Sequence, residues 1–129
     1  MKFNKIHHVA IICSNYKISR EFYVDKLGFE IIREVYRRER DSYKLDMKIG
    51  DSEIELFSFP NTPERLSYPE ARGLRHLAFE VSDVEEAVYE LNKKGIETEP
   101  IRVDEYTGRK FTFFEDPDKL PLELYEKLL

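Results

Sequence analysis

Apolar and polar residues follow one pattern that occurs twice along the chain. Each occurrence begins with an apolar strand, continues through a helix that ends at a glycine, and closes with three more strands. The first has strands at residues 6–13, 29–36, 43–49 and 52–59, and its helix runs from Ser14-Asn15 to Gly28. The second has strands at residues 74–81, 96–103, 110–114 and 120–125, and its helix runs from the capping sequence Ser82-Asp83-Val84-Glu85 to Gly95. The pattern predicts an α+β protein built from two βαβββ modules.

We expect the two modules to form a single domain over residues 1–129. Module one covers residues 5–59, and module two covers residues 74–127. The linker between them, residues 60–73, holds three of the six prolines and has no apolar period. The strand at residues 6–13 is nearly all apolar and is predicted to be buried on both faces. Because each helix can cover only one face of its sheet, the remaining faces should meet, within one chain or between two.

Composition and charge exclude several classes of function. Hydrophobic residues make up 41% of the chain and charged residues 36%, which is typical of a globular protein. The net charge of −5 argues against a nucleic-acid binder, which needs clustered Lys and Arg. No apolar run is long enough for a membrane span or a signal peptide, and the single Cys13 cannot form an internal disulfide. We therefore expect a cytoplasmic protein with a small-molecule substrate, and neither nucleic acid nor membrane as a partner.

A repeated pair of His and Glu carries the strongest chemical signal. His8 recurs as His76 and Glu55 recurs as Glu123 at one offset, since 76 − 8 and 123 − 55 are both 68. Each residue alone could be a hydrogen-bonded core His or the polar side of a strand, but their joint recurrence predicts a metal site with all four as ligands. Two imidazoles and two carboxylates suit nickel, cobalt, zinc, manganese or iron, and the ligand types alone do not choose among these metals. A closed structural zinc is disfavoured because such sites usually contain cysteine.

Other residues near these ligands are candidates for catalysis and substrate binding. Glu55 and Glu123 could exchange between binding a metal and taking a proton, so both are candidate general bases. Strand alternation places Phe57, Phe59 and Glu80 on the same faces as the ligands. At predicted strand ends, basic residues could bind a carboxylate or phosphate, although surface charge is the commoner explanation: Arg37, Arg40, Arg102, Arg109 and Lys110.

The chain resembles the vicinal oxygen chelate (glyoxalase/bleomycin resistance/dioxygenase) superfamily, and within it the short bacterial glyoxalase I-like proteins. Matching segments span nearly the whole chain: Ile6-His7-His8-Val9-Ala10, Glu21-Phe22-Tyr23, Leu27-Gly28-Phe29, Ile54-Glu55-Leu56, Leu74-Arg75-His76-Leu77-Ala78 and Glu115-Asp116-Pro117-Asp118 before Leu122-Glu123-Leu124. The resemblance implies curved mixed sheets around a metal cavity, a homodimer, and proton transfer by Glu123. It also matches Arg72 to an arginine of other glyoxalases.

The function implied by this resemblance is that of a lactoylglutathione lyase-like metalloenzyme, with nickel or cobalt as the favoured metal. Such a lyase or isomerase acts on a small α-hydroxycarbonyl or hemithioacetal and transfers a proton through a metal-bound enediolate. Ile12 and Phe59 stand where bacterial glyoxalase I has an Arg and an Asn that bind glutathione, so the substrate and its thiol stay open. One alternative is a non-catalytic binding protein that sequesters a small anionic ligand. The other is a different enzyme of the superfamily, such as an epimerase or a thiol transferase.

Overall fold

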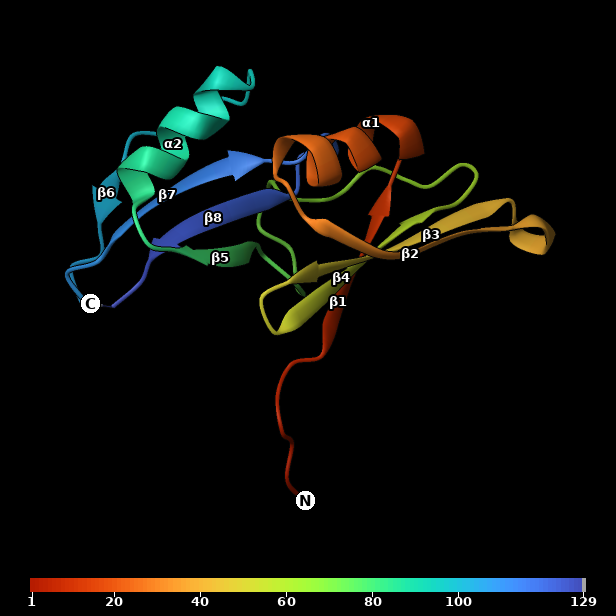
Figure 1. The fold of residues 1–129 in the computed structure, drawn as a ribbon, viewed down its shortest axis with the longest axis horizontal. Helices are drawn as coiled ribbons and strands as arrows, with labels where there is room; N and C mark the ends of the chain where they lie inside the picture. Colours follow the sequence, from red (N-terminus) through yellow and green to blue (C-terminus); the bar gives the residue numbers. More distant parts are fainter. Residues whose placement is uncertain (129) are drawn as a thin grey trace. The chain divides into compact units, whose positions relative to one another are not determined.

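The computed structural model describes residues 1–128, and the chain forms two compact units, Met1–Pro63 and Glu64–Leu129. Each unit contains one four-stranded mixed sheet with its helix on one face (Figure 1). The strand orders are β1-β4-β3-β2 and β5-β8-β7-β6, so the two units share one topology. The prediction of an α+β fold with two βαβββ modules is confirmed.

The first unit contains a helix in two parts and four strands. Its elements are β1 (His8–Cys13), α1 (Tyr16–Arg20), the π-helical segment η1 (Glu21–Lys26), β2 (Glu30–Arg37), the 3₁₀ turn η2 (Arg38–Arg40), β3 (Ser42–Ile49) and β4 (Ser52–Ser58). Asn15 begins the helix, because its Oδ1 accepts a hydrogen bond from the Ile18 backbone N–H at 3.2 Å. Gly28 has φ of +79°, a conformation that suits glycine and lets the chain leave the helix.

The core of the first unit lies between its helix and its sheet. Leu45, Met47 and Leu56 are fully buried there. On β1, Ile11 and Cys13 are buried, but Ile12 on the opposite face is 53% exposed. The prediction that this strand is buried on both faces is therefore wrong within the unit, because the single helical layer covers only one face of the sheet. We call the other side of each sheet its helix-free face.

The second unit repeats this plan with a longer helix. Its elements are β5 (Leu77–Val81), α2 (Val84–Lys93), β6 (Arg102–Val103), β7 (Lys110–Glu115) and β8 (Pro121–Glu126). Asp83, not the predicted Ser82, begins α2, and its Oδ1 accepts a hydrogen bond from the Glu86 backbone N–H at 3.0 Å. As predicted, the helix is followed by Gly95, with φ of +80°.

The predicted strand at residues 96–103 is wrong over most of its length, since β6 has only two residues. Pro100 has no backbone N–H to donate to a neighbouring strand. The carbonyl group before it accepts a hydrogen bond from a side chain: the Thr112 hydroxyl donates to the Glu99 carbonyl at 2.7 Å. Pairing with β7 therefore resumes only at Arg102, which lies opposite Phe111.

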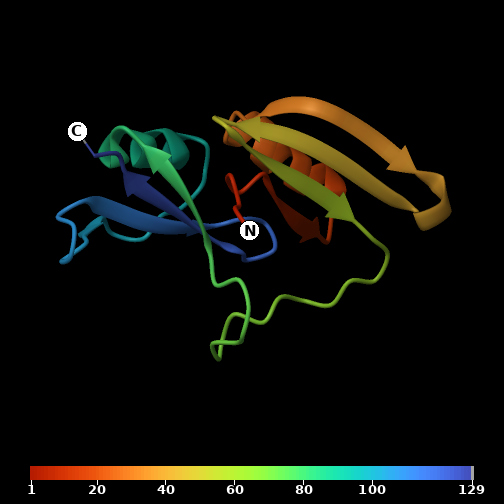
Figure 2. The ribbon, with the colours of Figure 1, turned by 90° about the horizontal axis from the view of Figure 1, so that it is seen from below.

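Residues 59–76 contain no helix or strand (Figure 2). As β5 begins at Leu77, His76 precedes the strand on which it was predicted to lie. No helix among residues 1–128 is long and apolar enough to span a membrane.

Candidate functional site

The first unit brings His8 and Glu55 together on its helix-free face. Parallel pairing of β1 with β4 places Ala10 opposite Glu55, and the His8 Nε2 lies 3.6 Å from the Glu55 Oε1. Both side chains remain accessible, at 42% and 21% exposure. On the other side of Glu55, the Lys44 Nζ lies 3.6 Å from its second carboxylate oxygen. The Glu55 carboxylate is therefore flanked by an imidazole and a cation.

Asp46 lies directly opposite Glu55 on β3 and is almost fully buried. Its carboxylate accepts hydrogen bonds from the Lys44 Nζ at 2.6 Å and the Arg33 Nε at 3.1 Å. Burial by itself would raise the pKa of Asp46, but these two cations outweigh it and hold the pKa below its usual range. Asp46 thus stays ionised and forms a close ion pair with Lys44.

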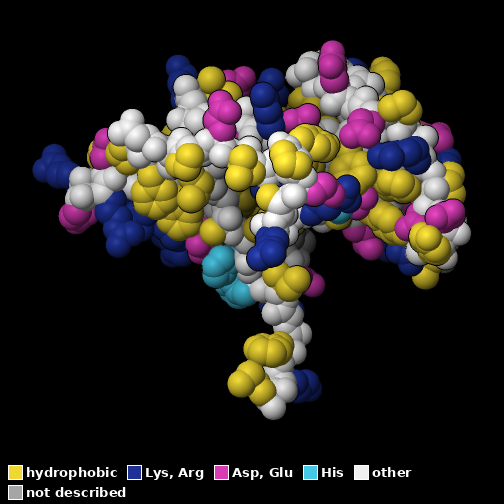
Figure 3. Space-filling view, turned by 180° about the vertical axis from the view of Figure 1, so that it is seen from behind, with side chains coloured by type: hydrophobic (Ala, Val, Ile, Leu, Met, Phe, Trp, Pro, Cys, Tyr) yellow, Lys and Arg dark blue, Asp and Glu magenta, His cyan; other side chains and the backbone are white. Residues whose placement is uncertain are grey.

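His7 also belongs to the surroundings of His8. The two rings are joined through their Nδ1 atoms at 3.0 Å, and the His7 Nε2 lies 3.8 Å from Glu53. Histidine side chains are visible at the molecular surface (Figure 3). Neither His7 nor Asp46 was among the predicted site residues. Alternation places neighbouring residues on opposite faces, but His7 precedes the first residue of β1, where that rule does not hold.

The second unit brings His76 and Glu123 together in the same way. Parallel pairing of β5 with β8 places Ala78 opposite Glu123, and the His76 Nε2 lies 3.7 Å from the Glu123 Oε1. These side chains are 28% and 13% exposed, less than their counterparts in the first unit. The residue opposite Glu123 on β7 is Phe113, whose ring meets that of His76 edge to face at 5.0 Å.

This apolar setting changes the acidity of Glu123. Burial raises the pKa of Glu123 above its usual range, and the positive charges of His76 and Arg102 oppose the rise only in part. A carboxylate with a raised pKa is a stronger base, so Glu123 is suited to accept a proton.

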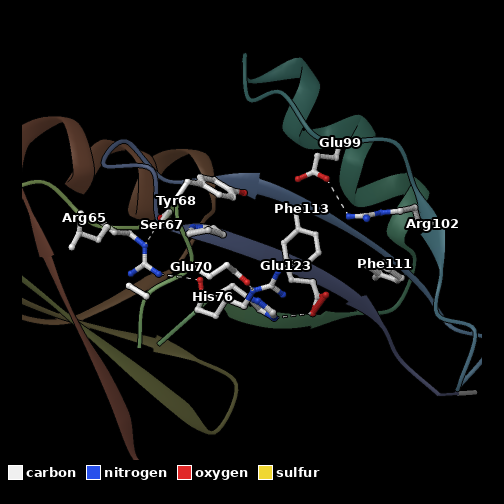
Figure 4. A pocket seen from close by; sticks show the side chains of 14 residues that line it. Arg65, Ser67, Tyr68, Glu70, His76, Glu99, Arg102, Phe111, Phe113 and Glu123 are labelled. Carbon is white, nitrogen blue, oxygen red and sulfur yellow. Dashed lines mark hydrogen bonds and ion pairs between the residues drawn. The ribbon is translucent and has the colours of Figure 1, made fainter. Parts of the chain in front are cut away.

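A cavity of about 470 Å³ lies beside this pair and is formed entirely by the second unit (Figure 4). Arg65 closes one wall, because its Nη2 donates to the carbonyl groups of Leu74 and Arg75 at 2.7 and 3.0 Å. Two arginines that line the cavity form ion pairs with glutamates that also line it: Arg75 with Glu70 at 2.8 Å, and Arg102 with Glu99 at 3.1 Å. The cavity therefore gives a small molecule access to His76 and Glu123.

The other predicted site residues are only partly gathered around the two pairs. Phe57 and Phe59 stack on each other with centroids 5.8 Å apart, and Phe57 lies two residues after Glu55 on the same strand. Arg109 lies over the Tyr125 ring at 5.6 Å, and Glu80 is opposite Tyr125. Arg72 is exposed. None of the five predicted substrate-binding residues lines the cavity: Phe57, Phe59, Arg72, Glu80 and Arg109.

The donor set and the separations in each pair fit a divalent metal ion. Two ligands that lie ~2.0–2.2 Å from one ion at ordinary coordination angles are ~3.0–3.5 Å apart. The N to O separations of 3.6 and 3.7 Å are close to this span and longer than a good hydrogen bond. Among residues 1–128, however, no three or more His, Cys, Asp or Glu side chains are grouped as metal ligands. Each unit by itself therefore brings together one His–Glu pair.

The chain is similar to known proteins over nearly its whole length. The model of the Glyoxalase/Bleomycin resistance protein/Dioxygenase superfamily matches residues 5–124. The protein YwkD of Bacillus subtilis (strain 168) is 63% identical, over 98% of this chain and 100% of its own length. A glyoxalase family protein from Enterococcus faecalis is 59% identical, and its crystal structure matches with a TM-score of 0.91 over 98% of this chain and 100% of that one.

A more distant structure shares the fold alone. The fosfomycin resistance protein FosX from Listeria monocytogenes, crystallised with Mn(II) and sulfate, is 19% identical to this chain. It matches with a TM-score of 0.72 over 99% of this chain and 96% of its own.

Proposed function

The chain belongs to the glyoxalase/bleomycin resistance protein/dioxygenase superfamily, and from this premise we propose that it is a metal-dependent lyase or isomerase of the glyoxalase I type. Its substrate is a small α-hydroxycarbonyl compound or a hemithioacetal. The ligands in this proposal are His8, Glu55, His76 and Glu123. The observation that carries it is the same His–Glu pair, with N to O separations of 3.6 and 3.7 Å, in both units.

A metal requirement is supported by the donor set and by a distant relative. FosX, which shares the fold, binds Mn(II) in its crystal structure. A bound divalent cation would supply Lewis acidity to two vicinal substrate oxygens. Imidazole and carboxylate ligands are compatible with nickel, cobalt, zinc, manganese or iron, and nickel or cobalt stay favoured. The homodimer implied by the resemblance also stays a proposal, which analytical ultracentrifugation tests.

In the proposed reaction, Glu123 removes a proton from a substrate carbon and returns it to the neighbouring carbon. Its place in the cavity wall supports this role, because a carboxylate there can reach a bound substrate. Phe113 and Phe111 line the cavity beside it and would limit the access of water to the reacting carbon. Glu55, with Lys44 at 3.6 Å, is the weaker candidate base.

The test combines metal analysis with isotope exchange. Protein purified without chelator is assayed for bound metals by mass spectrometry, stripped with EDTA, and reloaded with each candidate ion. Each form is then incubated in D₂O with the hemithioacetal of methylglyoxal and glutathione and with a panel of α-hydroxycarbonyl compounds. We expect NMR to show deuterium at carbon with the reloaded protein and none with the stripped protein. A loaded protein that exchanges no substrate would contradict the proposal and favour a binding protein.

A further inference from the structure

Arg37 is held rigidly on two aromatic rings of the first unit. Its guanidinium carbon lies 5.1 Å from the centroid of Phe57 and 5.7 Å from that of Phe59. Its Nη2 donates a hydrogen bond to the Ser42 hydroxyl at 3.0 Å, and Ser42 is fully buried. We call this arrangement of Arg37 on Phe57 and Phe59 the arginine shelf. Because the rings and the hydroxyl fix its plane, the guanidinium needs little further ordering to bind a ligand.

The charge on this shelf is not balanced by the protein. The Arg37 Nε is buried and has no hydrogen-bond partner among residues 1–128. Arg37 also takes part in none of the ion pairs of those residues, whereas Arg33 pairs with Asp46 and Arg102 with Glu99. Half-buried cations are normally paired, and a buried donor without an acceptor costs about 1–3 kcal/mol. The positive charge of Arg37 therefore has no anionic partner among residues 1–128.

The shelf lies on the same helix-free face as the His8–Glu55 pair. Phe57 is two residues beyond Glu55 along β4, a distance of about 6.6 Å in a strand. Lys44 stands between them, with its Nζ 3.6 Å from Glu55 and 5.9 Å from the Phe57 centroid. A molecule with one end at Glu55 and an anionic group on Arg37 would need only a short carbon skeleton.

We propose that the arginine shelf binds the anionic group, a carboxylate or a phosphate, of the substrate. The guanidinium offers charge-assisted N–H donors, and the flat rings beneath it exclude water from one side. That the bound molecule is a substrate rests on the proposed function. Binding at the arginine shelf restricts that molecule to small anionic compounds, such as hydroxy acids, keto acids or phosphorylated hydroxycarbonyl compounds.

Binding of simple anions to metal-free protein tests the shelf without any turnover. In the presence of EDTA, inorganic phosphate and malonate are titrated in separate arms, and NMR follows the Arg37 Nε–H signal and the backbone amides of Phe57 and Phe59. We expect one of the two anions to shift these signals at saturable concentrations. Arg37→Gln should weaken this binding about 10-fold or more, and Arg37→Lys should weaken it less.

Lys93→Gln is the matched control, because Lys93 is also a cation over an aromatic ring, at 4.8 Å from Tyr89, but is paired with Glu90 at 3.5 Å. It should leave anion binding unchanged. The inference is overturned if neither anion shifts the Arg37 signal, or if Lys93→Gln weakens binding as much as Arg37→Gln. If Arg37→Gln does not fold, the affinity of Arg37→Lys for the anion is the test. An affinity equal to that of the original protein would also overturn the inference.

Different results would refute the isomerase proposal and the arginine-shelf proposal. Anion binding at Arg37 in a protein that exchanges no substrate would leave the shelf in place and refute the isomerase. Exchange that proceeds equally well with neutral and anionic substrates, without anion binding at Arg37, would leave the isomerase in place and refute the shelf.

Discussion

The two His–Glu pairs share a backbone arrangement but differ in what faces the carboxylate. In both units an alanine of the first strand lies opposite the glutamate of the last, and the N to O separations differ by only 0.1 Å, from 3.6 to 3.7 Å. The strand next to the glutamate then supplies Asp46 opposite Glu55, but Phe113 opposite Glu123. One carboxylate thus lies among charges and the other beside aromatic rings. The difference suggests that the two halves of the repeat have separate chemical roles.

The largest expected effect separates these roles in catalysis. Glu123→Gln should slow deuterium exchange at the substrate carbon about 10²- to 10⁴-fold, because it removes the carboxylate that takes the proton in the proposed reaction. Glu55→Gln should slow it less, while both variants weaken metal binding. NMR exchange rates at saturating metal, together with metal affinities from calorimetry, check the prediction. Equal loss of exchange in both variants would show that the two carboxylates act alike.

A smaller effect concerns the buried carboxylate of Asp46, which lies opposite Glu55 in the first unit. Asp46→Asn removes the carboxylate shared by Lys44 and Arg33, so we expect it to destabilise that unit by about 1–3 kcal/mol. Hydrogen exchange of the β3 and β4 amides measures the loss, and the β7 and β8 amides serve as an internal control. Unchanged exchange in β3 would mean that Asp46 contributes nothing to the sheet.

The same residue predicts a dependence on pH. The pKa of Asp46 is lowered in the folded protein, so its stabilising contribution is complete above the unfolded pKa of about 3.9. The contribution is lost as the pH falls through the lower, folded-state pKa. Urea unfolding between neutral pH and pH ~3 should therefore show a smaller loss of stability in Asp46→Asn than in the original protein. Parallel losses in the two proteins would contradict this assignment.

The smallest effect compares the two helix caps. Asn15→Ala and Asp83→Ala each remove the oxygen that accepts the first free N–H of a helix, and each should cost about 1 kcal/mol. The loss should be larger for Asp83, because its charge also interacts with the helix dipole of the longer helix α2. Hydrogen exchange at the Ile18 and Glu86 amides reports on the two caps. A larger loss at Asn15 would reverse the expected order.

Strand alternation and the internal repeat were enough to predict most of the fold and to mark His8, Glu55, His76 and Glu123 as one set. They did not predict the parallel pairing of first and last strands that brings His8 to 3.6 Å from Glu55 and His76 to 3.7 Å from Glu123. They failed for β6, where Pro100 interrupts the pairing, and for the start of α2, where Ser82 and Asp83 are both good caps. The superfamily resemblance, which depended on the same segments, is confirmed.

Contacts across strands depended on the tertiary structure. The sequence pattern contains Arg37, Phe57 and Phe59. It does not show that the last side chain of β2 reaches the ring of Phe57 on β4 and that of Phe59 just beyond it. It likewise does not show that Asp46 faces one glutamate and Phe113 the other, since that depends on the register of β3 and β7. Alternation is a local property of each strand, whereas register depends on which strands become neighbours. The repeated His and Glu could therefore be found in the sequence, whereas the different neighbours of the two glutamates were decided by folding.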